Sequence, residues 1–294
     1  MKNTKALILG LVFSLLGSIS ASAQTRQVPL KPVLKPGQEN RYVINISVDT
    51  RVTPSGANGI ASVVRKETTA TVLLRGVAGN SGNSSAEVLI EAFNARTTID
   101  GVEAAEPEDS AAGKKIEYDL DEQGRATRVS FPPAAGKAGL AELLLSLARW
   151  TPSNEVSVGQ SWGQSVAIES LSGDLGYIAA PSIGEIPKKV AVSYRLSSLD
   201  GNKAIIDGAI MLDQSGSSSL TTRKGRLNVA GVAEGKGNTR IEYDVAAAQI
   251  VSATTETSFE GRLMNMAPTR EGEKPQPHEG SIVEKAKFSI KLVQ

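Results

Sequence analysis

The chain has 294 residues, with 32 Lys and Arg, 31 Asp and Glu, one His and no Cys, and a formal net charge of +1 at pH 7. A chain this close to neutral has no broad electrostatic field that would gather nucleic acid or anionic lipid, so neither is expected as a partner. One His and no Cys exclude zinc sites of the usual nitrogen and sulfur type. Because disulfides are excluded too, the fold must rest on its own hydrophobic core, for which the chain is long enough.

The first 23 residues have the pattern of a secretory signal peptide. Lys2 and Lys5 precede an apolar run over residues 6–16, and Ala-Ser-Ala at 21–23 supplies a cleavage site. The run is shorter than the roughly 20 apolar residues that a membrane-spanning helix needs, and no second such run follows. We therefore expect cleavage after Ala23 and a periplasmic or extracellular mature protein without a transmembrane span. A lipid anchor on a first mature cysteine is excluded, because there is no cysteine.

Alternation of apolar and polar residues predicts β-strands from about residue 40 onward. In the run 41–48, Tyr42, Ile44, Ile46 and Val48 share one face, which indicates a half-buried antiparallel strand. Similar runs occur at 62–77, 86–99, 190–197, 204–213, 219–230, 249–259 and 282–293. Clusters of turn-forming residues separate several of them, at 78–85, 120–124 and 199–202. Such turns predict consecutive hairpins rather than βαβ units.

One segment has a helical period. Its leucines recur at the spacing i, i+3, i+4 and i+7 and form a single apolar stripe: Leu140, Leu143, Leu144 and Leu147. Pro132 and Pro133 lie upstream, and Pro152 disfavours a helical conformation at Thr151. We expect a short amphipathic helix within 136–152 that packs on the sheet. Trp150 and Trp162 flank the turn after it and are expected to lock the helix to the sheet.

Three landmarks recur in the same order and predict an internal duplication. Gly37-Gln38 and Gly159-Gln160 lie 122 residues apart, as do Gly79-Asn80 and Gly201-Asn202. The sequence Ile-Glu-Tyr-Asp, here called IEYD, occurs at 116–119 and again 125 residues later, at 241–244. We therefore expect a mainly β protein in which two related antiparallel units, 24–135 and 153–294, form a curved sheet or open barrel with the helix between them.

The IEYD stretches have a structural interpretation. In each one, Ile and Tyr face one side near the end of a strand, and Asp119 or Asp244 is expected to begin the turn. An Asp carboxylate at that position accepts hydrogen bonds from nearby backbone amides.

No constellation with catalytic chemistry emerges, and we predict no catalytic, cofactor-binding or metal-binding residue and no cofactor. The single histidine, His278, lies in a polar, proline-rich stretch expected to be a loop, a poor place for a base that must be held rigidly. Residues 231–238, GVAEGKGN, superficially resemble a phosphate loop, but Gly237 replaces the required Ser or Thr and no helical pattern follows. We expect a glycine-bearing strand end or bulge there. The acidic residues of 100–110 fit a solvated loop better than a calcium site.

Two long irregular stretches, 170–188 and 264–281, contrast with the strand-rich remainder of the chain. Long loops often carry function, so these are the segments where a functional site is expected first.

The stretch from the leucine-rich segment through TPSNEVSVGQSW (151–162), together with the two Tyr-Asp turns, resembles a family of exported, β-rich bacterial proteins of unknown function. Members carry a Pro-x-x-x-Val-x-Val-Gly-Asp/Gln-x-Trp element after a short leucine-rich segment. This chain departs from the pattern at the second turn, where Gln249 stands in the place of Gly124. In architecture alone it is similar to periplasmic lipoprotein carriers, whose curved sheet and helix enclose an apolar cavity.

These observations favour an exported, non-enzymatic binding or carrier protein of the bacterial cell envelope, with an apolar small molecule or an envelope protein as its partner. One alternative is a structural or interaction protein that associates through strand edges or loops. A second alternative is a carboxylate-based hydrolase, which needs two carboxylates that converge in a cleft.

Overall fold

The computed structural model describes residues 26–54, 61–78, 84–104, 111–120, 126–130, 150–168, 188–222, 225–266 and 277–293. Within them the chain forms twelve strands: β1 (Glu39–Pro54), β2 (Ser62–Ala78), β3 (Ser84–Ile99), β4 (Val102–Glu103), β5 (Lys115–Leu120), β6 (Ala126–Ser130), β7 (Ser161–Ile168), β8 (Lys188–Asp200), β9 (Lys203–Thr222), β10 (Gly225–Asp244), β11 (Gln249–Met266) and β12 (Pro277–Val293). The described residues contain no helix long and apolar enough to cross a membrane. The mainly β prediction is confirmed.

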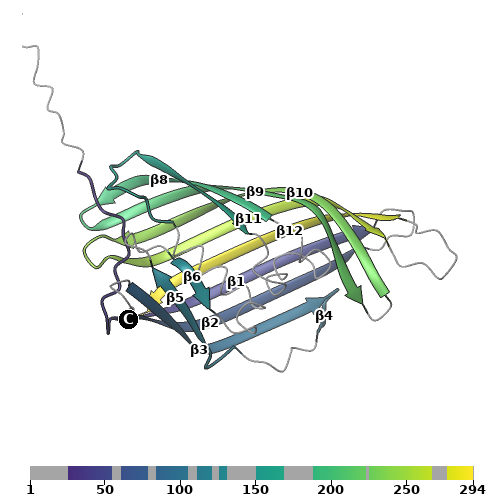
Figure 1. Ribbon diagram of the computed structural model, residues 1–294, viewed down its shortest axis with the longest axis horizontal. Coiled ribbons are helices and arrows are strands. Elements are labelled where there is room, and N and C mark those ends of the chain that lie inside the picture. Colours follow the sequence, from purple (N-terminus) through teal and green to yellow (C-terminus); the bar gives the residue numbers. More distant parts are fainter. Residues whose placement is uncertain are drawn as a thin grey trace, which may run out of the picture.

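The strands form one curved antiparallel sheet (Figure 1). Its order is β6-β5-β3-β2-β1-β12-β11-β10-β9-β8-β7, with β4 paired to β3. The strands of 24–135 therefore lie in one half of the sheet and those of 153–294 in the other. The halves meet where β1 pairs with β12, from Arg41 opposite Val293 to Pro54 opposite Gly280. Register shifts at Thr71/Val72, Leu196/Ser198 and Glu242/Tyr243 add local bends that increase the twist of the sheet.

One face of the sheet, the inner face, carries the core. It includes the alternate residues Tyr42, Ile44, Ile46 and Val48 of β1, as the alternation in the sequence predicts. Their cluster unites both halves of the sheet, because Ile116 and Tyr118 of one half and Leu196, Ile241 and Tyr243 of the other belong to it. A second cluster lies toward the other end of the strands and consists of Ile210, Leu212, Ala233, Phe259 and Ile282.

The two Gly-Gln turns make the same hydrogen bonds. Gly37 and Gly159 both have positive φ, at 81° and 90°, a conformation that glycine adopts without strain. Gln38 accepts a bond at Oε1 from the amide of Lys35, and Gln160 accepts the matching bond from Ser157. In each turn the glycine amide then donates to a strand carbonyl, Gly76 in β2 or Leu196 in β8. This likeness supports the duplication, which stays a prediction.

Several local predictions are wrong. The runs 204–213 and 219–230 are not separate strands with a break near 216, since β9 continues to Thr222 and β10 begins at Gly225. The glycines of GVAEGKGN lie inside β10 rather than at its end or a bulge, since the register with β9 and β11 is continuous over 231–238. At Gly235 and Gly237 the backbone of β11 leaves no room for a side chain. His278 is not in a loop but begins β12, opposite Asn265 of β11.

The two IEYD aspartates differ. Asp244 caps a turn as expected, since its Oδ1 accepts bonds from the amides of Ala246 and Ala247, both at 2.9 Å. Asp119 instead stays inside strand β5, opposite Arg128 of β6.

The predicted helix lies almost entirely outside the described residues, and the three that are described, 150–152, are not helical. The signal peptide and most of the stretches 170–188 and 264–281 also lie outside them. The described ends of the second stretch, 264–266 and 277–281, are strand.

Candidate apolar ligand site

A cavity of about 100 Å³ lies against the inner face at one end of the core cluster. We call it the inner pocket. Four neighbouring strands (β1, β2, β3 and β5), β12, an N-terminal segment and the turn into β11 supply its lining: Pro32, Leu34, Asn40, Tyr42, Val72, Leu74, Ala86, Val88, Tyr118, Leu120, Ala248, Gln249, Ile250 and Ile290. Apart from Asn40, Gln249 and the two tyrosine hydroxyls, the lining side chains are apolar, and none is charged. A space of this kind favours an uncharged, apolar ligand.

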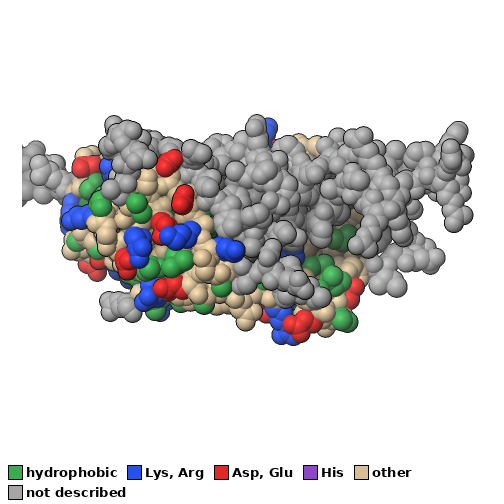
Figure 2. All heavy atoms as spheres, turned by 60° about the horizontal axis from the view of Figure 1, so that its bottom comes forward, with side chains coloured by type: hydrophobic (Ala, Val, Ile, Leu, Met, Phe, Trp, Pro, Cys, Tyr) green, Lys and Arg blue, Asp and Glu red, His purple; other side chains and the backbone are tan. Residues whose placement is uncertain are grey.

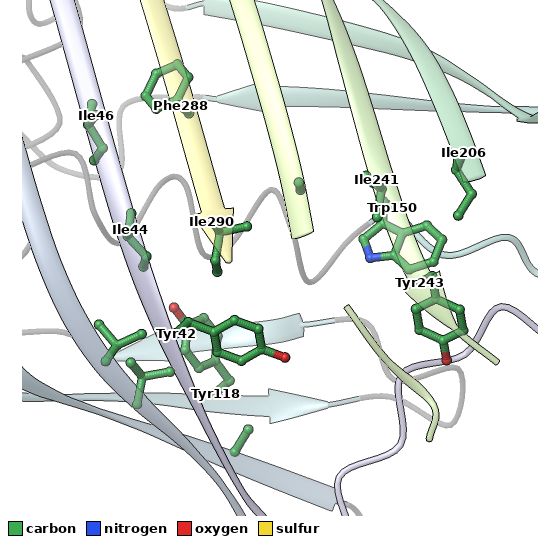
Figure 3. Packing of buried hydrophobic residues seen from close by; sticks show 14 of the residues in the cluster. Tyr42, Ile44, Ile46, Tyr118, Trp150, Ile206, Ile241, Tyr243, Phe288 and Ile290 are labelled. Atoms are coloured by element: carbon green, nitrogen blue, oxygen red, sulfur yellow. The ribbon is translucent and has the colours of Figure 1, made fainter. Parts of the chain in front are cut away.

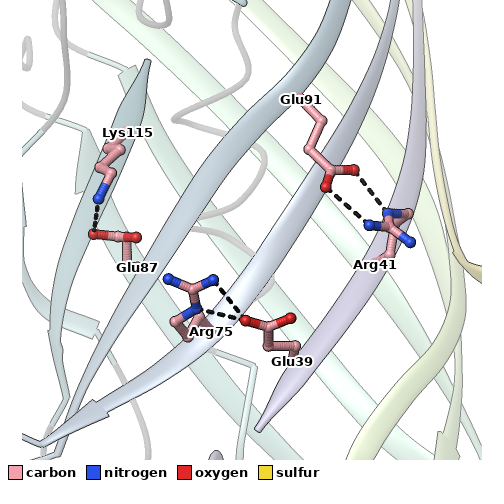
Figure 4. A network of polar contacts seen from close by, with 6 residues as sticks. All are labelled: Glu39, Arg41, Arg75, Glu87, Glu91 and Lys115. Atoms are coloured by element: carbon pink, nitrogen blue, oxygen red, sulfur yellow. Dashed lines mark hydrogen bonds and ion pairs between the residues drawn. The ribbon is translucent and has the colours of Figure 1, made fainter. Parts of the chain in front are cut away.

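Alternation along the strands builds the wall. On β1, β3 and β5 each pocket residue has at least one charged neighbour in the sequence, and along the strands such neighbours project from the opposite, outer face. Figure 4 shows three ion pairs there: Glu39 with Arg75, Arg41 with Glu91, and Glu87 with Lys115. The Arg41 guanidinium donates to both Glu91 oxygens, at 2.7 and 2.9 Å, and lowers the pKa of that carboxyl. Ion pairs on an exposed face stabilise a fold little. What matters for the pocket is that these charged side chains lie on the outer face and so leave the pocket lining uncharged.

The ion pairs continue across the outer face, farther along β1 and β2 at Asp49 with Arg65 and on β9 and β10 at Lys203 with Glu242 and Asp207 with Arg240. Acidic and basic side chains lie interspersed over the described part of the face in Figure 2.

Two segments that are far apart in the sequence cover the pocket. One is the chain before β1, around Pro32 and Leu34, and the other is the turn from β10 into β11. The amide of Val33 donates to the carbonyl of Ala248 at 3.2 Å and joins the two segments. Tyr42 Oη donates to the carbonyl of Ile250 at 3.1 Å and fixes the turn over β1. The cover is therefore tied to the wall by hydrogen bonds as well as by apolar contact.

The hydroxyl groups in the pocket differ in their bonding. Burial raises the pKa of Tyr42 to about 12, against a smaller opposing effect of the Asn40 side chain. Tyr118 is 4% exposed, and burial raises its pKa further. Among the described residues Tyr118 Oη has no hydrogen-bond partner. Both tyrosines are therefore neutral, and Tyr118 offers an unused donor and acceptor in an apolar setting.

An aromatic group outside the pocket fixes the chain that leads into β7. Trp150 is fully buried and meets Tyr243 edge to face, with ring centroids 5.4 Å apart. Trp162 stacks on Tyr194 at 5.8 Å. Figure 3 shows Trp150 beside Tyr243, apart from the group of Tyr42, Tyr118 and Ile290. Both tryptophans pack in the sheet's aromatic contacts, but that they lock a helix to the sheet stays a prediction, because the helical segment lies outside the described residues.

A second depression, of about 530 Å³, lies on the outer face over β1, β12, β11 and β10. Its lining contains two carboxylates, Asp49 and Glu256, the groups a hydrolase would need. Asp49 is ion-paired with Arg65 and Glu256 with Lys287, and both are well exposed. A general acid needs an environment that retains its proton, which exposure and a neighbouring cation do not provide. This depression is therefore the weaker candidate.

A buried polar cluster interrupts the inner face between the two apolar clusters. Glu284 of β12 is 3% exposed and accepts a bond from Thr50 Oγ1 of β1 at 3.2 Å. Lys66 of β2 lies near it, and burial lowers the pKa of this lysine while the Glu284 carboxylate opposes the change. The three side chains sit on the adjacent strands β2, β1 and β12, and the Thr50–Glu284 bond and the attraction between Glu284 and Lys66 suit a structural role.

No site residue was predicted from the sequence, and the described residues contain no group of three or more His, Asp and Glu that could hold a metal ion. In the acidic stretch 100–110, Asp100 accepts bonds from the Val63 amide and the Ser62 hydroxyl and so closes a turn. The inner pocket escaped sequence reasoning because its lining comes from seven separate stretches. The only local signal was the tyrosine in each IEYD.

No protein-family model matches the chain, and no curated protein matches its sequence. Among solved structures, lipovitellin, in a study of its lipid–protein interactions, is similar over 89% of this chain at 11% identity, with a TM-score of 0.47. The chain spans 26% of that protein. OmpF of Salmonella typhi is similar over 86% of this chain and 98% of its own, at 8% identity and a TM-score of 0.23. A LolA superfamily protein of Nitrosomonas europaea is similar over 89% of both chains, at 12% identity and a TM-score of 0.17. Similarities this low do not establish a shared fold or function.

Proposed function

We propose that this is an exported, non-enzymatic binding or carrier protein of the bacterial cell envelope that holds an apolar small molecule against the inner face of its sheet. The observation that carries the proposal is the inner pocket, an apolar space without charged lining whose cover is tied down from two distant parts of the chain. A cavity of about 100 Å³ is small compared with sites for whole drug-sized ligands, which measure roughly 300–1,000 Å³. It therefore receives one short apolar part of a ligand.

Export is supported by the signal-peptide pattern of residues 1–23, and the envelope by the resemblance to the exported β-rich family.

Native mass spectrometry tests the proposal. The full chain is produced with its signal sequence in a Gram-negative host, purified from the periplasm or medium, and measured before and after lipid extraction. We expect a bound species of defined mass that extraction removes.

A matched pair of substitutions in β3 assigns the bound species to the pocket. Ala86 lines the pocket, whereas Ala92 of the same strand is exposed. Ala86→Leu fills the cavity and should abolish the adduct, and Ala92→Leu should retain it. A protein that carries no adduct, or an adduct that survives Ala86→Leu, would overturn the proposal.

A further inference from the structure

The starting observation is the difference between two tyrosines that occupy the same position of the repeated IEYD sequence. Tyr118 and Tyr243 are both buried members of the core cluster on the inner face. Tyr243 Oη donates to the backbone carbonyl of Lys31 at 2.7 Å, and its ring packs against Trp150. The chain itself therefore supplies a carbonyl acceptor and an apolar partner to Tyr243. Tyr118 Oη has no hydrogen-bond partner within the described residues, and Tyr118 lines the inner pocket instead.

Within the described residues, Tyr118 Oη is the only unpartnered buried side-chain polar atom of the pocket lining. The described residues contain three buried side-chain polar atoms without a hydrogen-bond partner: Tyr118 Oη, Trp150 Nε1 and Thr151 Oγ1. Only the first belongs to a residue that lines the cavity. A buried hydroxyl without a partner is costly, and Phe would fill the same position without that cost. A hydroxyl at this position is explained if a bound ligand supplies its hydrogen-bond partner.

We propose that the ligand is a neutral acyl compound whose carbonyl oxygen accepts a hydrogen bond from Tyr118 Oη while its apolar chain end fills the inner pocket. This inference rests on the proposed function and names the ligand class of the same site. The ligand carbonyl accepts the hydrogen bond of Tyr118 Oη, as the Lys31 carbonyl accepts that of Tyr243 Oη. Asn40 supplies a second polar side chain in the lining. An ionised head group is disfavoured because the lining contains no cation to offset its desolvation.

Methyl hexanoate and hexanoate are the probes, since they share one chain and differ in the charge at the carbonyl end. NMR titrations on the full mature protein at neutral pH follow the amide signals of 86–90 and 116–120. The variants are Tyr118→Phe and, as the matched control, Tyr243→Phe, which loses a bond outside the pocket.

Methyl hexanoate should shift these signals and bind at least tenfold more tightly than hexanoate. Tyr118→Phe should weaken that binding about three- to tenfold, the effect of one net hydrogen bond, without lowering thermal stability. Tyr243→Phe should have the opposite profile, with unchanged binding and a lower melting temperature.

The outcomes separate this inference from the proposed function. Equal binding by Tyr118→Phe and wild type, equal binding of the two probes, or a loss of stability in Tyr118→Phe would each overturn the inference. A co-purifying adduct without any binding of methyl hexanoate would also overturn it and leave the carrier function standing. Absence of both the adduct and probe binding would remove the carrier function itself.

Discussion

The indole nitrogen of Trp162 donates a hydrogen bond to the backbone carbonyl of Trp150 at 2.8 Å. Twelve residues separate the two, and the bond joins strand β7 to the segment that enters it. The same segment carries the fully buried Trp150 ring against Tyr243 of β10. The Trp162 side chain, in the edge strand β7, thus anchors the segment that carries the buried Trp150 ring.

Replacement of Trp162 by Phe should test this bond. Phe keeps an aromatic ring against Tyr194 but removes the donor, so the carbonyl of Trp150 loses its partner. We expect a loss of about 1 kcal/mol in the free energy of unfolding. Urea denaturation followed by circular dichroism measures the change, and an unchanged midpoint would show that the bond does not stabilise the fold.

Glycine at 237 should be required by close packing inside β10. A Cβ atom there would collide with the carbonyl oxygen of Glu256 on β11 and would lie 2.7 Å from Thr257 Cγ2. We expect Gly237→Ala to destabilise the protein by about 1–3 kcal/mol. Gly163→Ala in β7 is the control, because the nearest atom to its Cβ is the Val192 oxygen at 3.9 Å. Thermal melts of both variants should differ clearly, and equal melting temperatures would contradict the packing account.

Two buried threonines on the inner face should respond differently to Val. Thr50 donates to the buried Glu284, whereas Thr68 of β2 makes no side-chain hydrogen bond within the described residues. Thr50→Val should cost about 1.5–3 kcal/mol, the value for a hydrogen bond to a charged group. Thr68→Val should be neutral or stabilising. Chemical denaturation of the pair decides, and a similar loss in both would mean that the Thr50–Glu284 bond contributes nothing specific.

The buried tyrosines should make stability fall at alkaline pH. Burial raises the pKa of Tyr42 and Tyr194 to about 12, above the value near 10 of an unfolded tyrosine. A group whose folded pKa is raised contributes stability that is fully present below its unfolded pKa and is lost as pH rises through the folded one. The free energy of unfolding should therefore decline between about pH 10 and 12. Phenolate absorbance should appear near pH 10 in denaturant but later in the native protein, and coincident titrations would contradict the burial.

The local periods of the sequence predicted most of the long strands but not the short strands β4 to β7. Alternation in 41–48 identified β1 and its buried face, because every second side chain of a strand points to the same face of the sheet. The turn clusters at 78–85 and 199–202 correctly located the ends of β2 and β8, since glycine and asparagine tolerate the positive φ of tight turns. Where polar serines and glycines lie inside long strands, as in β9 and β10, the same rule failed. Pairing with two neighbours overrides a local preference for turns there.

By itself the sequence determined that the protein is mainly β, that its strands are antiparallel, which face of each strand is apolar and that no usual zinc site is possible. These follow from composition and from patterns within a few residues. The order of the strands, the joining of the two halves through β1 and β12, and the pocket at Tyr118 were decided only by the tertiary structure. The physical reason is that a cavity, or an unpartnered hydroxyl, is a relation among side chains far apart in the chain. IEYD has the same letters twice, and only the surroundings leave one tyrosine hydroxyl bonded to Lys31 and the other without a partner in the described residues.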